Sequence, residues 1–511
     1  MGYKEITLKL PTDYSDEQLK KRIAKKLGLK SFTYQIERKS LDARKKGTIH
    51  WQLKVAVSSK EIKGQEPEPQ PILRIPYSKR SQKVVVVGSG PAGFFAAFVL
   101  QKAGFQTTLI ERGTDVKKRE SEITRFERTG QFSPISNYAF GEGGAGTFSD
   151  GKLTSRTKGI TAEKEFMISS YIQAGAPEEI AYMAHPHVGS DNLRIVVKNL
   201  RDEYHESGGV IHFETLLQDI SVRNGRVVKA VTSAGPFETD ALFIATGHSA
   251  YETYRMLIDR GVPFRAKNFA IGYRAEHAQE IINRALWGRT FLPGVKAAEY
   301  RLAARSADRP VYTFCMCPGG YVVPATAYAN TNIVNGMSYY QRDGQFANAA
   351  CVAGVHPDEL LGRQASASET LDYVAGLENR FYDFDFGYTA PSCSIRDFIN
   401  QTETAHTIKS SYPLGIKRAA LWEMLPAPIT KSIRKGLREF SRKLPGYDSG
   451  VLLGLESKTS SPVQVVRERS GLCDGFENLY MVGEGSGWAG GIISSGVDGI
   501  RAAKSFIDRS K

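Results

Sequence analysis

The chain has 511 residues, 41% of them hydrophobic and 24% charged, which is enough for two or three globular domains with sizeable cores. It has no apolar run of 18 residues, no hydrophobic segment of the signal-peptide kind near its start, and only five cysteines. These features argue against a membrane-spanning protein and against a secreted disulphide scaffold. We therefore expect a cytoplasmic protein that keeps its thiols reduced.

The positive charge is concentrated at the start of the chain. Of the net charge of +14, residues 1–80 contribute +10, because they hold 14 Lys and 5 Arg against 9 acidic residues. An alternating strand, a helix opened by the capping box of Ser15 and Gln18, and two further strands predict a small β-α-β-β domain over residues 1–62. A Pro- and Glu-rich linker over residues 63–82 separates this basic domain from the rest of the chain.

A dinucleotide-binding pattern follows the linker. The uniformly apolar strand 84–87 precedes Gly88, Gly90 and Gly93 in the G-x-G-x-x-G spacing, and then come an apolar helix and a second strand that ends at Glu111. In this pattern the first glycine permits the tight turn, the second lets backbone approach a pyrophosphate, and the third lets the helix pack on the sheet. The helix N-terminus favours the phosphates, and the acid accepts hydrogen bonds from ribose hydroxyls.

A second glycine-rich stretch covers residues 140–153 and contains five glycines. Backbone at Gly144 and Gly146 can lie against a phosphate or a planar ring, and long glycine loops are more often functional than idle. Lys152, at the end of this stretch, either approaches the bound group or is simply solvated, and the sequence leaves both interpretations open.

The chain is then predicted to leave the nucleotide-binding domain and to return to it. Three meander strands, the last of them over residues 237–245, lead to the sequence I-A-T-G, which ends at Gly247. Near the C-terminus a strand leads into Gly483 and a last helix. Between them lies a region of mixed strands and helices that is rich in aromatic residues. We predict a nucleotide-binding domain in two parts, residues 83–259 and 446–511, with an inserted substrate domain over residues 260–445.

This order of elements resembles the glutathione-reductase-like class of FAD proteins. The resemblance implies an α/β fold, with a Rossmann-like FAD-binding domain, an inserted α+β substrate domain and the small β-α-β-β domain in front. It also implies that Glu111 holds the adenosine ribose, that Glu484 holds the ribitol, and that the last helix begins at the flavin. The residues implied to contact FAD are Gly88, Ser89, Gly90, Pro91, Ala92, Gly93, Glu111, Arg112, Gly144, Gly146, Lys152, Gly247, Gly483, Glu484, Gly490, Gly491 and Ile492.

Longer motifs narrow the resemblance to one family. The stretches YAFGEGGAGTFSDGKL, FAIGYRAEH, FCMCPGG, NGMSYYQRD and SKTSSPVQVVR are together similar to bacterial and plastid proteins called FAD-dependent, or NAD(FAD)-utilising, dehydrogenases. The similarity spans nearly the whole chain, including the basic first domain. It implies FAD as the cofactor and leaves the substrate open.

Cys315 and Cys317 are the most conspicuous candidates for chemistry. On a regular strand their side chains share one face, and the following Pro-Gly-Gly would let the chain turn over a ring. The pair is either a redox partner of the flavin or small apolar packing, and packing is favoured because no residue nearby in the sequence lowers a thiol pKa. Lys152 and His277 are further catalytic candidates, although an isolated His is more often structural or at the surface. No Cys or His group has the spacing of a structural zinc site, so we expect no metal.

These patterns predict an FAD-dependent oxidoreductase that transfers hydride between a small organic substrate and flavin N5. Outside the segments assigned to FAD, no further G-x-G-x-x-G follows a strand, so NAD(P)H has no predicted Rossmann domain of its own. The alternative is an RNA-associated flavoprotein whose basic first domain docks nucleic acid, although like charges around a helix are more often merely solvated. No feature of the sequence indicates an oligomeric state.

Overall fold

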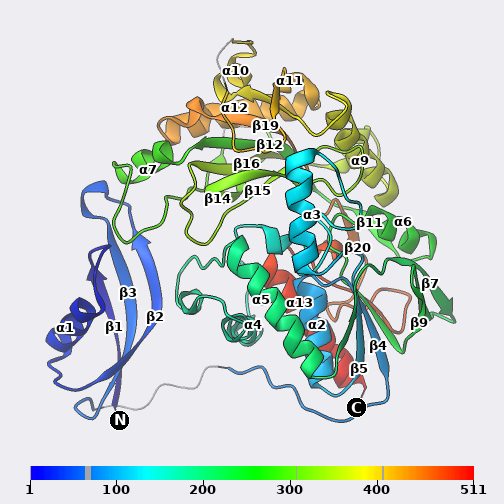
Figure 1. The fold of residues 1–511 in the computed structure, drawn as a ribbon, viewed down its shortest axis with the longest axis horizontal. Coiled ribbons are helices and arrows are strands. Elements are labelled where there is room, and N and C mark those ends of the chain that lie inside the picture. Colours follow the sequence, from blue (N-terminus) through cyan, green and yellow to red (C-terminus); the bar gives the residue numbers. More distant parts are fainter. Residues whose placement is uncertain (1, 64–70, 306–307, 405–407, 511) are drawn as a thin grey trace.

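The computed structural model describes residues 2–63, 71–305, 308–404 and 408–510. Figure 1 shows an N-terminal unit on one side and an α/β body on the other, which lies beneath a large sheet and its covering helices. Part of the predicted linker, residues 64–70, lies outside the described residues.

The N-terminal unit is a three-stranded antiparallel sheet with one helix. Its elements are β1 (Gly2–Leu10), α1 (Asp16–Leu27), β2 (Thr33–Asp42) and β3 (His50–Ser59). The strand order is β1-β3-β2, and the capping box of Ser15 and Gln18 opens α1 as the sequence predicts. Alternate residues of β1 and β3 pack with Leu19 and Ile23 of α1 in a core of their own.

A five-stranded parallel sheet forms the centre of the body. Its strands and the helices packed on one face are β4 (Lys83–Val87), α2 (Pro91–Lys102), β5 (Gln106–Ile110), α5 (Ser190–Glu206), β6 (Val210–His212), β10 (Ala241–Ile244), β21 (Leu479–Met481) and α13 (Ile492–Arg509). The order is β21-β10-β4-β5-β6, with β4 in the middle. Val84 and Val86 pack in the core of these helices, whereas Val85 and Val87 belong to the core on the opposite face. Burial on both faces explains why residues 84–87 of β4 are all apolar.

Helices α2 and α13 lie against each other through glycines. A Cβ atom placed on Gly499 would lie 2.0 Å from the carbonyl oxygen of Ala92, and one on Gly93 would lie 1.9 Å from that of Gly88. No side chain fits at such distances, so these glycines let α2 pack tightly against both the sheet and the last helix.

A three-stranded meander, β7 (Leu217–Arg223), β8 (Arg226–Thr232) and β9 (Gly235–Glu238), precedes β10. The sequence predicts a single strand over residues 237–245 as the third strand of the meander. This prediction is wrong, because the segment forms two strands, β9 and β10, which belong to different sheets. The Asp240 carboxylate accepts a hydrogen bond from Lys83 N at 2.8 Å. The chain turns there from the meander into the parallel sheet.

The region after residue 260 builds a larger sheet. Its strands are β12 (Phe269–Ala278), β13 (Ala303–Ala304), β14 (Val311–Pro324), β15 (Val334–Met337), β16 (Phe346–Val355), β17 (Ala390–Ser394), β18 (Ile416–Arg418) and β19 (Val451–Glu456). The order is β13-β14-β16-β12-β19-β17-β18, and β15 pairs with β14. Because β19 lies between β12 and β17, the sheet extends past the predicted boundary at residue 445. The apolar pattern of β19 suits either sheet, and only its pairing decides between them.

Helices α9 (Ala367–Asp383) and α12 (Ala427–Lys443) pack on this sheet (Figure 1). The other elements are α3 (Val116–Thr129), α4 (Thr161–Gln173), α6 (Tyr251–Asp259), β11 (Phe264–Ala266), α7 (Gln279–Trp287), α8 (Pro357–Leu361), α10 (Ile395–Asn400), α11 (Leu421–Met424) and β20 (Val463–Val465). Among the described residues, no helix is long and apolar enough to cross a membrane.

Candidate functional site

Three segments that the sequence predicts to contact FAD meet at the N-terminal end of α2. A Cβ atom placed on Gly90 would lie 3.7 Å from the Cα of Gly144, and one placed on Gly146 would lie 3.1 Å from the side chain of Ile492. The fingerprint turn, the glycine-rich stretch and the start of α13 are therefore neighbours, although they are far apart in the chain.

The N-termini of the two helices at this place are open. Gly90 and Gly491 are the N-cap residues of α2 and α13, and glycine has no side chain to cap them. A Cβ atom on Gly491, or on Gly247 just beyond β10, would meet no atom of the described residues within 4 Å. The N–H groups of each first turn therefore keep their partial positive charge for an anionic group, and the surrounding backbone can be approached closely.

Three other glycines of the predicted set face into the protein. A Cβ atom would lie 2.4 Å from the carbonyl oxygen of Ala245 at Gly88, 1.9 Å from that of Gly88 at Gly93, and 2.5 Å from the Cβ of Ala92 at Gly483. Gly88 and Gly483 also have φ values of 100° and 75°, which side chains rarely adopt. Substituting these glycines would test the packing of the sheet more than a contact with a cofactor.

Glu111 is buried, and its carboxylate already accepts four hydrogen bonds. Its donors are Ser89 N at 2.9 Å, Ser89 Oγ at 2.8 Å, Gly113 N at 2.9 Å and Gly141 N at 3.2 Å. The carboxylate thus ties the fingerprint turn to the glycine-rich stretch. The spacing rule places an acid at this position, but it does not reveal this second use.

The two remaining polar residues of the predicted set differ from each other. Arg112 pairs with Glu252 and lies 3.8 Å from the ring centroid of Phe140. Glu484 is half-buried, and its carboxylate accepts no hydrogen bond from any described residue. A Cβ atom on Gly490 would lie 3.7 Å from Glu484 Oε1. Glu484 is therefore a free acceptor beside the open start of α13.

Arg119 on α3 is a buried cation that the sequence interpretation missed. Burial lowers its pKa to about 10. Its guanidinium donates to five backbone carbonyls of the glycine-rich stretch and the residues just before it, namely Asn137 at 2.9 Å, Tyr138 at 2.9 Å, Gly141 at 3.2 Å, Glu142 at 2.8 Å and Gly144 at 2.8 Å. A single side chain thus sets the shape of the loop that faces Gly90. The sequence signal that could have indicated its burial is the position of Arg119 in the apolar stripe of the helix, together with Ile123 and Phe126.

The end of the glycine-rich stretch carries a buried charge cluster. Arg342 donates to Asp150 through Nε at 3.0 Å and Nη2 at 2.6 Å, and Lys152 Nζ lies 3.4 Å from the same carboxylate. Burial would raise the pKa of Asp150, but Lys152 and Arg342 hold it well below its usual value. Lys152 also donates to the carbonyl of Met316, and 28% of its side chain is exposed. Lys152 is therefore held by Asp150 and the Met316 carbonyl and is not simply solvated.

The catalytic candidate His277 lies away from this cluster in an aromatic core. Its Nε2 lies 2.7 Å from the carbonyl oxygen of Tyr447, and its ring packs against Tyr447 and Tyr300. Burial lowers its pKa to about 4, so the ring is neutral. This environment gives His277 a structural role. The expectation of a proton donor followed from the residue type alone and did not include these neighbours.

The backbone around Cys315 and Cys317 departs from the expected regular strand. Strand β14 continues through the motif, with register shifts on both sides of Cys317, and Cys315 has a φ of 45°. The sequence predicts a tight turn at Pro318-Gly319-Gly320, but β14 continues through these residues to Pro324. A Cβ atom on Gly319 would lie 1.9 Å from the carbonyl oxygen of Arg342. Gly319 and Gly320 let β14 approach the backbone at Met337 and Arg342 closely.

The two thiols lie beside a buried cation. Arg274 Nη2 donates to the carbonyl of Cys315 at 2.7 Å and lies 3.4 Å from Cys317 Sγ, while Nη1 pairs with Glu456 at 3.2 Å. A hydrogen bond from the Cys317 thiol, Arg274 and Lys152 lower the pKa of Cys315 to about 6. Both cations come from segments far away in the sequence, so the residues nearby in the sequence, on which the packing interpretation was based, did not indicate them.

Part of the charge of the N-terminal unit has internal partners. Lys20 and Lys21 pair with acids one turn earlier in α1, and Arg44 pairs with Asp42. Lys39 docks the unit on the body through backbone bonds to residues 182 and 184, and Trp51 is buried. None of these features favours the RNA-associated alternative.

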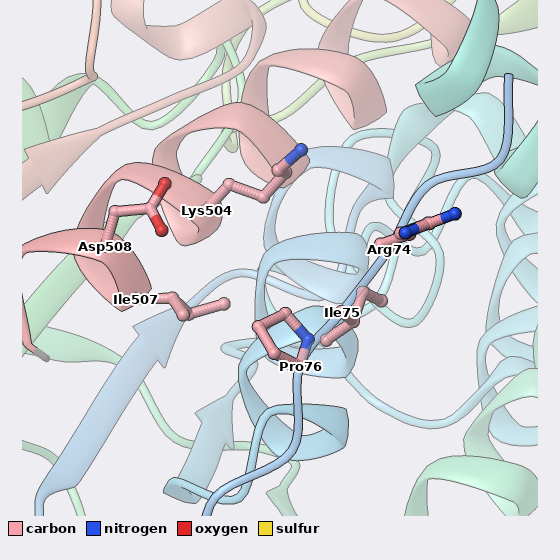
Figure 2. A pocket seen from close by; sticks show the side chains of 6 residues that line it. All are labelled: Arg74, Ile75, Pro76, Lys504, Ile507 and Asp508. Atoms are coloured by element: carbon pink, nitrogen blue, oxygen red, sulfur yellow. The ribbon is translucent and has the colours of Figure 1, made fainter.

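A surface pocket of about 200 Å³ lies at the far end of α13 (Figure 2). It is lined by Arg74, Ile75, Pro76, Lys504, Ile507 and Asp508. Lys504 lies twelve residues beyond Ile492 in the same helix, which corresponds to about 18 Å. This pocket is therefore separate from the site at the start of α13.

Family models match most of the chain. Residues 82–282 match "Pyridine nucleotide-disulphide oxidoreductase", residues 268–459 match "FAD-dependent protein, C-terminal domain-like", and residues 3–58 match a domain of unknown function. A protein of Clostridium beijerinckii described as uncharacterised is 38% identical over 528 residues, which cover 99% of this chain and 98% of that protein. The chain belongs to the FAD-dependent pyridine nucleotide-disulphide oxidoreductase family. It is an FAD-dependent oxidoreductase, and FAD is its cofactor.

Solved structures are similar only at a distance. Glycine oxidase from Bacillus cereus is 12% identical with a TM-score of 0.33, and the match covers 84% of this chain and 96% of that one. L-proline dehydrogenase from P. horikoshii is 12% identical with a TM-score of 0.35, and the match covers 85% of this chain and 94% of that one.

Proposed function

We propose that the protein holds FAD in the manner of the glutathione-reductase-like class. The pyrophosphate lies on the turn at Gly90 and the start of α2, Glu111 borders the adenosine ribose, and Glu484 accepts hydrogen bonds from the ribitol. The observation that carries this proposal is the meeting of Gly90, Gly144 and Gly146 with the start of α13. The open backbone at the two helix N-termini and the unpartnered carboxylate of Glu484 support it.

The bound flavin supplies two-electron hydride chemistry at N5, and a small organic substrate is the other partner. The contribution of the chain is electrostatic and positional. The start of α13, at Gly490, Gly491 and Ile492, is suited to stabilise negative charge at the pyrimidine carbonyl of the reduced ring. We assign Lys152 to the substrate side, because Asp150 keeps its ammonium charged and part of its side chain is exposed. From there it orients a polar substrate and holds a proton.

The same proposal gives a domain division. Residues 1–62 form the basic β-α-β-β domain, residues 63–82 the linker, and residues 83–259 the first part of the FAD-binding domain. The inserted substrate domain starts near residue 260 and, because β19 belongs to its sheet, ends after Glu456. Separate hydrophobic cores in the N-terminal unit and behind the parallel sheet support this division.

The test uses the purified full-length protein. It should carry non-covalent FAD, become reduced by anaerobic photoreduction, and be reoxidised by a member of a metabolite panel while the flavin absorbance band is followed. Lys152→Met should slow that reoxidation at least tenfold and leave the FAD content unchanged, whereas Lys158→Met, an exposed neighbour, should change neither. A protein that takes up no FAD on reconstitution would refute the proposal. Equal rates in both variants would refute the role of Lys152.

A further inference from the structure

We propose that Cys315 and Cys317 form a reversible dithiol–disulphide couple that exchanges with a small-molecule disulphide, with Cys315 as the attacking thiol. This activity goes beyond the proposed function, because the exchange uses only side chains of the chain. The motif also lies outside residues 82–282, which match the pyridine nucleotide-disulphide oxidoreductase family, so that match does not assign it.

The local backbone brings the two thiols together. Residues two apart on a regular strand are separated by about 6.6 Å between Cα atoms, near the upper limit for a disulphide. Here the strand is irregular on both sides of Cys317, and Cys315 has a left-handed φ of 45°, which bends the chain between the two residues. The Cys317 thiol donates to the backbone carbonyl of Cys315 at 3.4 Å, and both cysteines are free thiols. Strained non-glycine backbone of this kind is concentrated at functional sites.

The surroundings make the two thiols unequal. Cys315 is partly exposed and faces the cations Arg274 and Lys152, whereas Cys317 is fully buried. The acids near the pair are Asp150, which raises the pKa of Cys315, and Glu456. The two cations and the Cys317 hydrogen bond outweigh these acids, so Cys315 is the thiolate at neutral pH. Cys317 stays protonated until it attacks the mixed disulphide at Cys315.

The other three cysteines provide an internal contrast. Cys351, Cys393 and Cys473 are buried without a neighbouring thiol, and burial raises the pKa of each. For Cys351 and Cys473 the pKa rises to about 12. A reagent that reacts with thiolates should therefore select the pair at residues 315 and 317.

The exchange proceeds in two balanced steps. The Cys315 thiolate attacks one sulfur of the disulphide RSSR, so a mixed disulphide forms and RS⁻ leaves. Cys317 then loses its proton, attacks Cys315 Sγ and releases the second RS⁻. In total one RSSR is reduced to two RSH, and two cysteine thiols are oxidised to one disulphide, so no other oxidant or reductant is required.

The experiment uses the FAD-loaded full-length protein and 4,4′-dithiodipyridine as the disulphide. The wild type and Cys351→Ser should each release two thiopyridones per chain rapidly and end two hydrogen masses lighter. Cys317→Ser should release one and keep the adduct, and Cys315→Ser should react at least tenfold more slowly. In the wild type, the initial rate should depend on pH with an apparent pKa near 6, a measurement that needs no variant.

A Cys315→Ser protein that reacts as fast as the wild type would overturn the proposal, as would a wild type that keeps a stable adduct. An apparent pKa of about 8.5, the value of an ordinary thiol, would overturn the role of Arg274 and Lys152. The FAD content is measured in the same samples. Loss of thiol exchange with FAD retained would refute this inference and leave the proposed function standing, whereas loss of FAD with exchange retained would do the reverse.

Discussion

Replacing Gly90 by Asp should make the free protein slightly more stable and at the same time prevent FAD binding. Gly90 is the N-cap of α2 with an ordinary φ of −66°, and a Cβ atom there would make only a normal contact, 3.7 Å from Gly144. Asp is among the best N-cap residues, and its charge suits a helix N-terminus. We expect a gain of about 0.3–1 kcal/mol in the free energy of unfolding of the FAD-free protein.

The cost to FAD binding is larger because a carboxylate would occupy the place proposed for the pyrophosphate. Two unit charges repel each other by about 2–4 kcal/mol at separations of about 4–8 Å and an effective dielectric constant of about 20. Since each 1.4 kcal/mol corresponds to a factor of ten, the dissociation constant for FAD should rise by roughly 30-fold to several hundred-fold.

Denaturant unfolding of the FAD-free proteins and FAD titration by flavin fluorescence measure the two effects separately. Gly376→Ala is the matched control, because Gly376 lies inside α9 with open space around it and gains helix propensity of about 0.5–1 kcal/mol. It should stabilise the protein to a similar extent without changing FAD affinity. A Gly90→Asp protein that binds FAD as tightly as the wild type would refute the placement of the pyrophosphate.

Three further predictions follow from the site. Arg119→Lys should leave at least two of the five bonded carbonyls without a donor, so the free energy of unfolding should fall by about 2–5 kcal/mol and FAD affinity should fall as well. The control Arg125→Lys, an exposed residue on the same helix, should change neither. Thermal unfolding and FAD titration curves that are equal for the two variants would contradict this prediction. The pKa of His277 falls from 6.5 to about 4 on folding, so its contribution to stability is complete above pH 6.5 and is lost as the pH falls toward 4. His277→Gln should reduce that loss by about 3 kcal/mol in urea unfolding at pH 4–7 and leave turnover unchanged, and an unaltered slope would contradict the neutral ring. NADH and NADPH should reduce the flavin slowly or not at all; stopped-flow bleaching at about 1–10³ per second would contradict that expectation.

The sequence by itself determined the elements whose signal is local. The capping box at Ser15, the apolar strand before Gly88 and the glycine spacing that opens α2 depend on residues within one or two turns of each other, so their structures follow from composition and period. The same is true of the β-α-β-β order of the N-terminal unit. The motifs were also sufficient to assign the chain to a family that uses FAD.

Only the tertiary structure decided which side chains meet. Nothing near Cys315 in the sequence indicates a cation, yet Arg274 and Lys152 reach it from β12 and from the glycine-rich stretch. Similarly, the sequence analysis placed residues 446–511 together in the nucleotide-binding domain, whereas β19 pairs in the larger sheet, because the pattern of an apolar strand suits either sheet equally well. A pKa and a strand partner depend on distances of a few ångströms between segments far apart in the chain. Such distances are set by packing and not by local pattern.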